Sequence, residues 1–210
     1  MKFLLAAVFA AGLIAAGPAS AALVTFETPT SFGSINHHYD GGTDSGGLTG
    51  TYHGIWFNGD ALAVQNDELG PYFSNAPSPL GVMAPVGADA TMNVAAGFAG
   101  VASLYYSSIE AAIVNIWSGY DGTGSLLGAF NLTNNAQTAC SDSPYCNWSL
   151  ASFDLGSDVA RSITFGSAAS IAGFDDVQVE VVPLPAALPM LAFGLAGMGA
   201  FMRRRKQALV

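Results

Sequence analysis

Positive charge is almost absent from the middle of this 210-residue chain. Of the six basic residues only Arg161 lies between residues 22 and 181, whereas all 15 acidic residues lie there, which leaves that stretch with a net charge of −14. A surface of this sign repels phosphate backbones, so nucleic acid is excluded as a partner. The same excess of carboxylates favours divalent cations, with calcium as the first candidate.

Motifs of known catalytic chemistry are also missing. The sequence contains no G-x-S-x-G, no H-E-x-x-H, no P-loop and no dinucleotide-binding fingerprint. Its histidines are His37, His38 and His53, and a strand would point the adjacent pair to opposite faces, which argues against a histidine metal site. We therefore predict that the protein is not an enzyme. Carboxylate pairs for glycoside hydrolysis leave an extracellular polysaccharide-active hydrolase as the alternative.

Cysteine is scarce, with Cys140 and Cys146 the two present. They lie close together in a stretch rich in Ser, Asp, Pro and Asn, which in an oxidising compartment favours one local disulfide. Two free thiols are the alternative. A zinc site would need two further ligands nearby, and the sequence offers none.

Long amphipathic helices are absent from the middle of the chain, where short β-rich runs recur instead. Clusters of Gly, Asn, Asp, Ser and Pro separate these runs and are typical of turns. About ten strands are expected, at residues 24–27, 54–57, 61–64, 91–98, 101–106, 111–117, 126–132, 148–154, 162–165 and 174–182. The pattern predicts an all-β fold over residues 22–181, an antiparallel β-sandwich or jelly roll.

The last of these strands alternates most clearly. Its valines, Val177, Val179 and Val181, fall on one face and its polar residues on the other. By the same parity Asp175 points toward the core with the valines. A carboxylate at a core-facing position requires a partner there.

The N-terminus has the three parts of a signal peptide. Lys2 gives the positive region, residues 3–16 the apolar region, and Ala19 and Ala21 frame a small-x-small cleavage site. We expect signal peptidase to cut after Ala21, so that residues 1–21 are removed.

The C-terminus, residues 182–210, has the pattern of a membrane-spanning segment preceded by a proline motif. The motif is Val182, Pro183, Leu184, Pro185 and Ala186, and the apolar run from Ala186 to Met202 has 17 residues, the short limit for a span. The basic cluster Arg203, Arg204, Arg205 and Lys206 follows at once and should stay cytoplasmic, which places the middle of the chain outside. A plain single-pass anchor is the alternative.

This combination of proline motif, short span and arginine cluster resembles the sorting tail of the PEP-CTERM family in its VPLPA variant. The resemblance covers about the last 25 residues. It implies that an exosortase-type membrane protease cleaves near the proline motif and passes the protein to the cell surface or extracellular matrix of a Gram-negative bacterium. The precursor would be anchored in the inner membrane.

A second resemblance concerns the middle of the chain. An early strand ending in Glu27 and a final strand opening at Phe174 and Asp175 resemble the jelly rolls of carbohydrate-binding modules. That resemblance implies a structural calcium bound by Glu27 and Asp175; capping of a turn by Asp175 is the alternative. Trp117 and Tyr120, beside the turn at residues 118–122, are the predicted sugar-stacking residues.

Together these patterns predict an exported, structural or carbohydrate-binding β-sandwich associated with exopolysaccharide or biofilm. Its expected partners are signal peptidase, an exosortase-type protease and extracellular polysaccharide.

Overall fold

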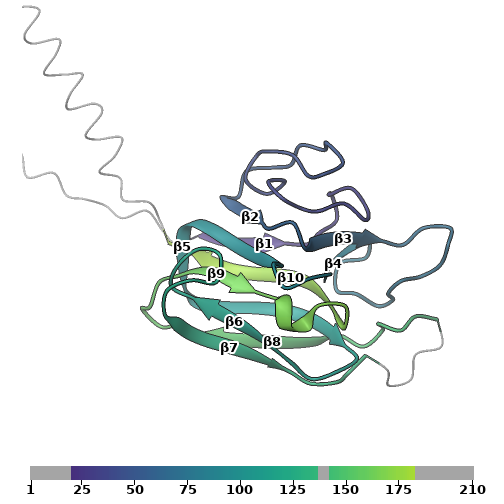
Figure 1. Cartoon of the computed structure of the whole chain (residues 1–210). Coiled ribbons are helices and arrows are strands. Elements are labelled where there is room, and N and C mark those ends of the chain that lie inside the picture. Colours follow the sequence, from purple (N-terminus) through teal and green to yellow (C-terminus); the bar gives the residue numbers. More distant parts are fainter. Residues whose placement is uncertain (1–19, 137–141, 183–210) are drawn as a thin grey trace, which may run out of the picture. The chain divides into compact units, whose positions relative to one another are not determined.

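The computed structural model describes residues 20–136 and 142–182, which belong to one compact unit, Ala19–Val182. The predicted all-β class is confirmed, since the one helical element in these ranges is a 3-10 turn, η1 (Gly166–Ala168) (Figure 1). The strands are β1 (Ser20–Val24), β2 (Ile55–Phe57), β3 (Ala61–Gln65), β4 (Gly81–Pro85), β5 (Thr91–Ser108), β6 (Ala112–Trp117), β7 (Leu126–Leu132), β8 (Ser149–Asp154), β9 (Ala160–Thr164) and β10 (Ala172–Val181).

Strand β5 belongs to both layers of the sandwich. Its N-terminal part pairs with β2 and β9, and its C-terminal part pairs with β10 and β8, in each case antiparallel. Gly97 and Gly100 separate the two parts with φ angles of 78° and 66°, which glycine adopts without a Cβ penalty. The first layer therefore contains β1, β3, β4, β10 and β8, and the second contains β2, β9, β6 and β7.

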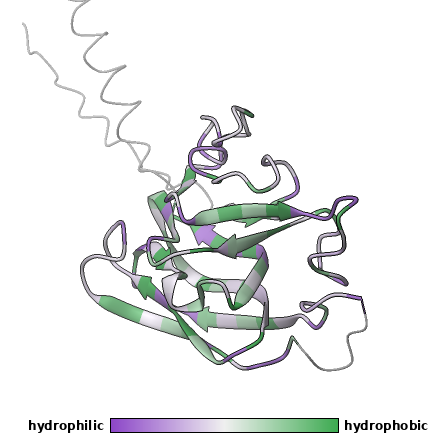
Figure 2. Ribbon diagram, turned by 45° about the vertical axis from the view of Figure 1, so that its right-hand side comes forward, coloured by the Kyte–Doolittle hydropathy of each residue, from purple (hydrophilic) through white to green (hydrophobic). Residues whose placement is uncertain are grey.

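The core lies between the two layers. Hydrophobic residues (green in Figure 2) recur along the strands of both layers, and many purple residues lie in the loops. In β10 the predicted alternation is confirmed, with Val177 and Val179 buried and Gln178 and Glu180 exposed. The largest fully buried side chains are Phe26, Phe98, Phe165, Phe174, Ile35, Ile55, Met83, Met92, Leu104, Ile116, Ile163 and His38.

Three elements differ from the sequence-based expectation. The two strands expected at residues 91–98 and 101–106 are one strand, β5. Strand β4, between Pro79 and Pro85, was not predicted, because prolines and Gly81 at its ends are turn residues. Strand β1 ends at Val24, earlier than expected, because Phe26 has a φ of 59° and leaves the extended conformation.

One edge of β10 is shared by two strands. Strand β1 pairs with residues 177–181 of β10, and β4 pairs with Phe174. Between them lies Asp176 with a φ of 46°, where the register of β10 against β5 shifts. We call residues 175–176 the β10 bulge. It lies where β1 ends and the turn leading into β4 approaches, at residues 78–81.

The ends of this unit bear on the targeting predictions. Ser20 pairs with Val181 in β1, so cleavage after Ala21 would remove the first two residues of that strand. Val182 donates its backbone N–H to the Gly97 carbonyl oxygen, and the rest of the predicted sorting motif and the basic cluster lie outside the described residues, as does Ala19. Residues 20–136 and 142–182 contain no helix that is long and apolar enough to span a membrane.

Candidate functional site: an aromatic pocket on the first layer

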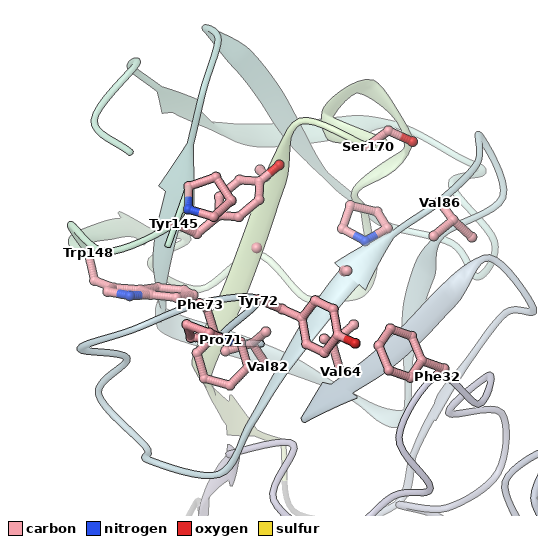
Figure 3. A pocket seen from close by; sticks show the side chains of 15 residues that line it. Phe32, Val64, Pro71, Tyr72, Phe73, Val82, Val86, Tyr145, Trp148 and Ser170 are labelled. Atoms are coloured by element: carbon pink, nitrogen blue, oxygen red, sulfur yellow. The ribbon is translucent and has the colours of Figure 1, made fainter. Parts of the chain in front are cut away.

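A pocket of about 330 Å³ opens on the outer face of β3, β4 and β10 (Figure 3). Its floor is made of small and aliphatic residues of these strands: Val64, Val82, Ala84, Ala172 and Gly173. Its walls come from three separate segments and carry aromatic rings. In Figure 3, Tyr145 and Trp148 lie on one side of the pocket and Phe32 on the other, with Tyr72 between them.

Trp148 is held in place by its indole N–H and by the floor. Its Nε1 donates to the Ser74 carbonyl oxygen at 2.9 Å, and its ring meets Phe73 edge to face with the centroids 6.4 Å apart. A Cβ at Gly173 would lie 3.3 Å from Cη2 of the indole, closer than ordinary van der Waals contact. Glycine at this position therefore lets the Trp148 ring lie against the sheet.

Tyr72 is fixed by polar contacts on the opposite wall. Its hydroxyl donates to Asp67 Oδ1 at 3.2 Å, and its backbone N–H donates to Asn66 Oδ1 at 2.8 Å. Phe32, itself 51% exposed, packs edge to face on the Tyr72 ring at 5.1 Å. Desolvation and the neighbouring Asp67 carboxylate raise the pKa of Tyr72, so its hydroxyl stays protonated as a hydrogen-bond donor.

The wall that contains Tyr72 and the wall that contains Tyr145 and Trp148 are joined through residues 142–145. Ser74 donates its N–H to the Tyr145 carbonyl oxygen at 2.9 Å and its hydroxyl to Asp142 Oδ1 at 3.1 Å. The Ser143 hydroxyl lies 3.1 Å from the Tyr72 carbonyl oxygen. Because the walls are tied to each other, the aromatic rings are preorganised before any ligand arrives.

The predicted stacking residues Trp117 and Tyr120 are on the second layer, away from this pocket. Trp117 Nε1 donates to Thr164 Oγ1 at 3.1 Å, and the Tyr120 hydroxyl donates to the Ala95 carbonyl oxygen at 2.8 Å. The Tyr120 ring lies 5.2 Å from that of Trp56 and 5.1 Å from Cζ of Arg161. Both side chains are half-buried in packing contacts, and their role in sugar binding stays a prediction.

Glu27 and Asp175, the predicted calcium ligands, both contact the turn at residues 78–81. Glu27 Oε1 accepts the N–H groups of Leu80 and Gly81 at 2.9 and 3.0 Å. Asp175 is fully buried, and its carboxyl group accepts the Ser78 N–H at 2.7 Å and the Asp176 N–H at 2.7 Å. These contacts match the turn-capping alternative. No group of three His, Cys, Asp or Glu side chains in residues 20–136 and 142–182 is arranged to hold a metal ion.

The surroundings of Asp175 favour its protonated form. Ser78 Oγ lies 2.7 Å from Asp175 Oδ1 and 2.9 Å from the Thr25 carbonyl oxygen, but it has one proton to donate. With Asp175 ionised, Ser78 donates to either the carboxylate or Thr25; with Asp175 protonated, the carboxyl O–H can donate to Ser78 Oγ, which leaves the Ser78 proton for Thr25. Burial raises the pKa of Asp175 to about 7, against the opposing effect of the Ser78 and Asp176 donors.

The histidines lie in the loop between β1 and β2. His38 is buried between the Thr28 hydroxyl, 2.8 Å from Nε2, and the Leu48 carbonyl oxygen, 3.2 Å from Nδ1. His37 contacts Asp40 at 2.6 Å at the surface. These contacts shape the loop.

Cys146 is buried, whereas Cys140 lies outside the described residues, so the disulfide between them stays a prediction.

Comparison with known proteins gives no family. No protein-family model and no curated protein matches the sequence. Among solved structures, the CBM22-1 xylan-binding domain of Xyn10C from Paenibacillus barcinonensis is 11% identical, with 81% of this chain and 99% of that chain covered and a TM-score of 0.39. The cleaved adhesin domain of Lys-gingipain from Porphyromonas gingivalis is 12% identical over 77% of this chain and 98% of its own, with a TM-score of 0.43. A family 29 carbohydrate-binding module from Piromyces equi is 12% identical over 77% and 89%, with a TM-score of 0.38.

Proposed function

We propose that this protein is an exported, non-enzymatic β-sandwich that binds carbohydrate in the pocket between Phe32, Tyr72, Tyr145 and Trp148. The observation that supports the proposal is the pocket itself, where aromatic rings fixed by hydrogen bonds surround an apolar floor. Pyranose rings present apolar C–H faces that pack on such rings, while tyrosine hydroxyls and carboxylates accept or donate hydrogen bonds at the sugar edges. An extracellular polysaccharide is the partner we infer.

Binding is tested by affinity electrophoresis of the full chain against a panel of soluble polysaccharides, with the protein in a detergent that has no sugar headgroup. Tyr72→Ala should weaken retention by about tenfold, which is about 1.4 kcal/mol. Tyr52→Ala is the matched control, since Tyr52 is 68% exposed and lies outside the pocket. If no polysaccharide retards the protein, or both variants behave alike, the proposal is wrong. Release of reducing sugar by the same preparation would favour the hydrolase instead.

We further propose that the chain is processed as a sorting substrate at its C-terminal end. The supporting observation is the place where the domain stops: β10 ends at Val181, and Val182, the first residue of the proline motif, makes the last backbone hydrogen bond that the structure describes. The motif would then follow the folded domain directly, where an exosortase-type protease would find it. Replacing Pro183 and Pro185 by alanine in the full chain should leave the precursor at full length in membrane fractions. Unchanged processing on an immunoblot would refute this.

A further inference from the structure

Two carboxylates are linked by hydrogen bonds to the aromatic walls of the pocket, Asp67 directly and Asp142 through Ser74. On one side Asp67 Oδ1 accepts the Tyr72 hydroxyl at 3.2 Å. On the other side Asp142 Oδ1 accepts the Ser74 hydroxyl at 3.1 Å, and the carbonyl oxygen of the same Ser74 holds the Trp148 indole. Both carboxylates leave one oxygen without a protein donor among the contacts of the described chain. The lining of the pocket itself is mostly apolar, and the two carboxylates lie behind it, where Asp67 contacts the lining residue Tyr72 directly.

Within residues 20–136 and 142–182, positive charge is missing from the side that carries the pocket. The single basic residue of the domain, Arg161, donates to Ala95 and Tyr120 next to the second layer. A uronate or sulfated glycan would approach this pocket against the field of a domain with a net charge of −14. An aromatic ring beside carboxylates instead suits a cation, which is attracted both by the ring face and by the charge.

We propose that the pocket prefers a polysaccharide with free amino groups, a β-linked amino-sugar chain that carries ammonium groups. This inference rests on the proposed carbohydrate function and names its substrate class. The sugar faces pack on Tyr72 and Trp148. The ammonium groups meet Asp67 and Asp142. The neutral, N-acetylated form of the same chain keeps the stacking and loses the charge contacts.

The test compares three β-1,4-linked hexamers, of glucosamine, N-acetylglucosamine and glucose, by calorimetry with the full chain at about pH 5.5 and low salt. We expect the glucosamine hexamer to bind at least about tenfold more tightly than the glucose hexamer. The difference should shrink in 0.5 M salt, because exposed charges are screened within about 4 Å there.

Two double variants separate a local effect from a general one. Asp67→Asn with Asp142→Asn should lower the ratio of glucosamine to glucose binding by about fivefold or more, because asparagine keeps an acceptor oxygen for Tyr72 and Ser74 but carries no charge. Asp158→Asn with Glu110→Gln removes the same net charge from exposed positions outside the pocket and should keep the preference.

The outcomes are distinct. If none of the hexamers binds, the proposed function itself fails for this glycan class. If glucose and glucosamine hexamers bind equally, the amino-sugar inference is overturned and carbohydrate binding stands. If Tyr72→Ala binds glucosamine as well as the unchanged chain does, the attraction is ion exchange over the acidic surface, and the inference is likewise overturned.

Discussion

Replacing Asp175 with asparagine should change how the stability of the domain depends on pH. Burial raises the pKa of Asp175 to about 7 in the folded chain, against an ordinary value of 3.8. Between these two values the folded state holds a proton that the unfolded chain has released. Its contribution to stability is therefore complete below the lower value and is lost as the pH rises toward the higher one, by about 1.4 kcal/mol per pH unit.

The magnitude follows from the pKa, which already includes the opposing effect of the Ser78 and Asp176 donors. Over the full interval the loss is at most about 4 kcal/mol. Asparagine stays neutral, so it removes this dependence. However, its amide N–H must face the Ser78 or the Asp176 N–H, which costs about 1–3 kcal/mol. The variant should be less stable than the unchanged protein at pH 5 and should match or exceed it at pH 8.

Urea unfolding followed by tryptophan fluorescence at pH 5, 6, 7 and 8 measures this difference. Other titrating groups cancel when the two free energies of unfolding are subtracted at each pH. Asp158→Asn, at an exposed position, is the control, and its free energy of unfolding should change with pH as that of the unchanged protein does. If the free energy of Asp175→Asn also follows that of the unchanged protein at every pH, Asp175 does not hold a proton in the folded state and the hydrogen-bond assignment at Ser78 is wrong.

Three further predictions concern other contacts. Asp44→Ala should destabilise the domain by about 1–3 kcal/mol, seen as a lower urea midpoint, because the buried carboxylate accepts the backbone N–H groups of Thr30, Gly46 and Leu48. Burial acts to raise the pKa of Asp44, but these donors lower it below its usual value, so its contribution to stability is lost as the pH falls through that pKa. Gly173→Val should displace Trp148 and weaken polysaccharide retention in affinity electrophoresis by about tenfold, which is about 1.4 kcal/mol. EDTA should leave the melting midpoint unchanged, since backbone N–H groups already bond to Glu27 Oε1 and to both carboxyl oxygens of Asp175. A midpoint raised by calcium would support the calcium hypothesis instead.

Local patterns in the sequence were sufficient for much of the fold. The alternation of Val177 and Val179 predicted which face of β10 is buried, and the parity of Asp175 predicted a core-facing carboxylate with a partner. The partner, Ser78, was not predictable, because it comes from the turn before an unpredicted strand. The φ of Phe26 is likewise set by tertiary packing, which overrides the strand preference of an aromatic residue.

The aromatic pocket could not be predicted from local patterns, because its walls come from segments far apart in the sequence. Phe32, Tyr72 and Trp148 are brought together by the pairing of β3 and β4 and by the Ser74 contacts. The predicted candidates Trp117 and Tyr120 were chosen from a turn motif. Their contacts with Thr164 and Arg161 could not be predicted, because these residues lie far from them along the chain. A weaker signal was present, since Tyr145 and Trp148 lie within one turn-rich stretch beside Cys146.

The pairing of Ser20 with Val181 means that the polypeptide enters and leaves this unit at one corner. Domains with neighbouring ends can be inserted into a surface loop of a host protein, or joined in tandem by short linkers, without distorting either protein. In such a fusion the host chain would connect to strands β1 and β10. The sandwich is thus suited to insertion into unrelated host proteins as a self-contained unit.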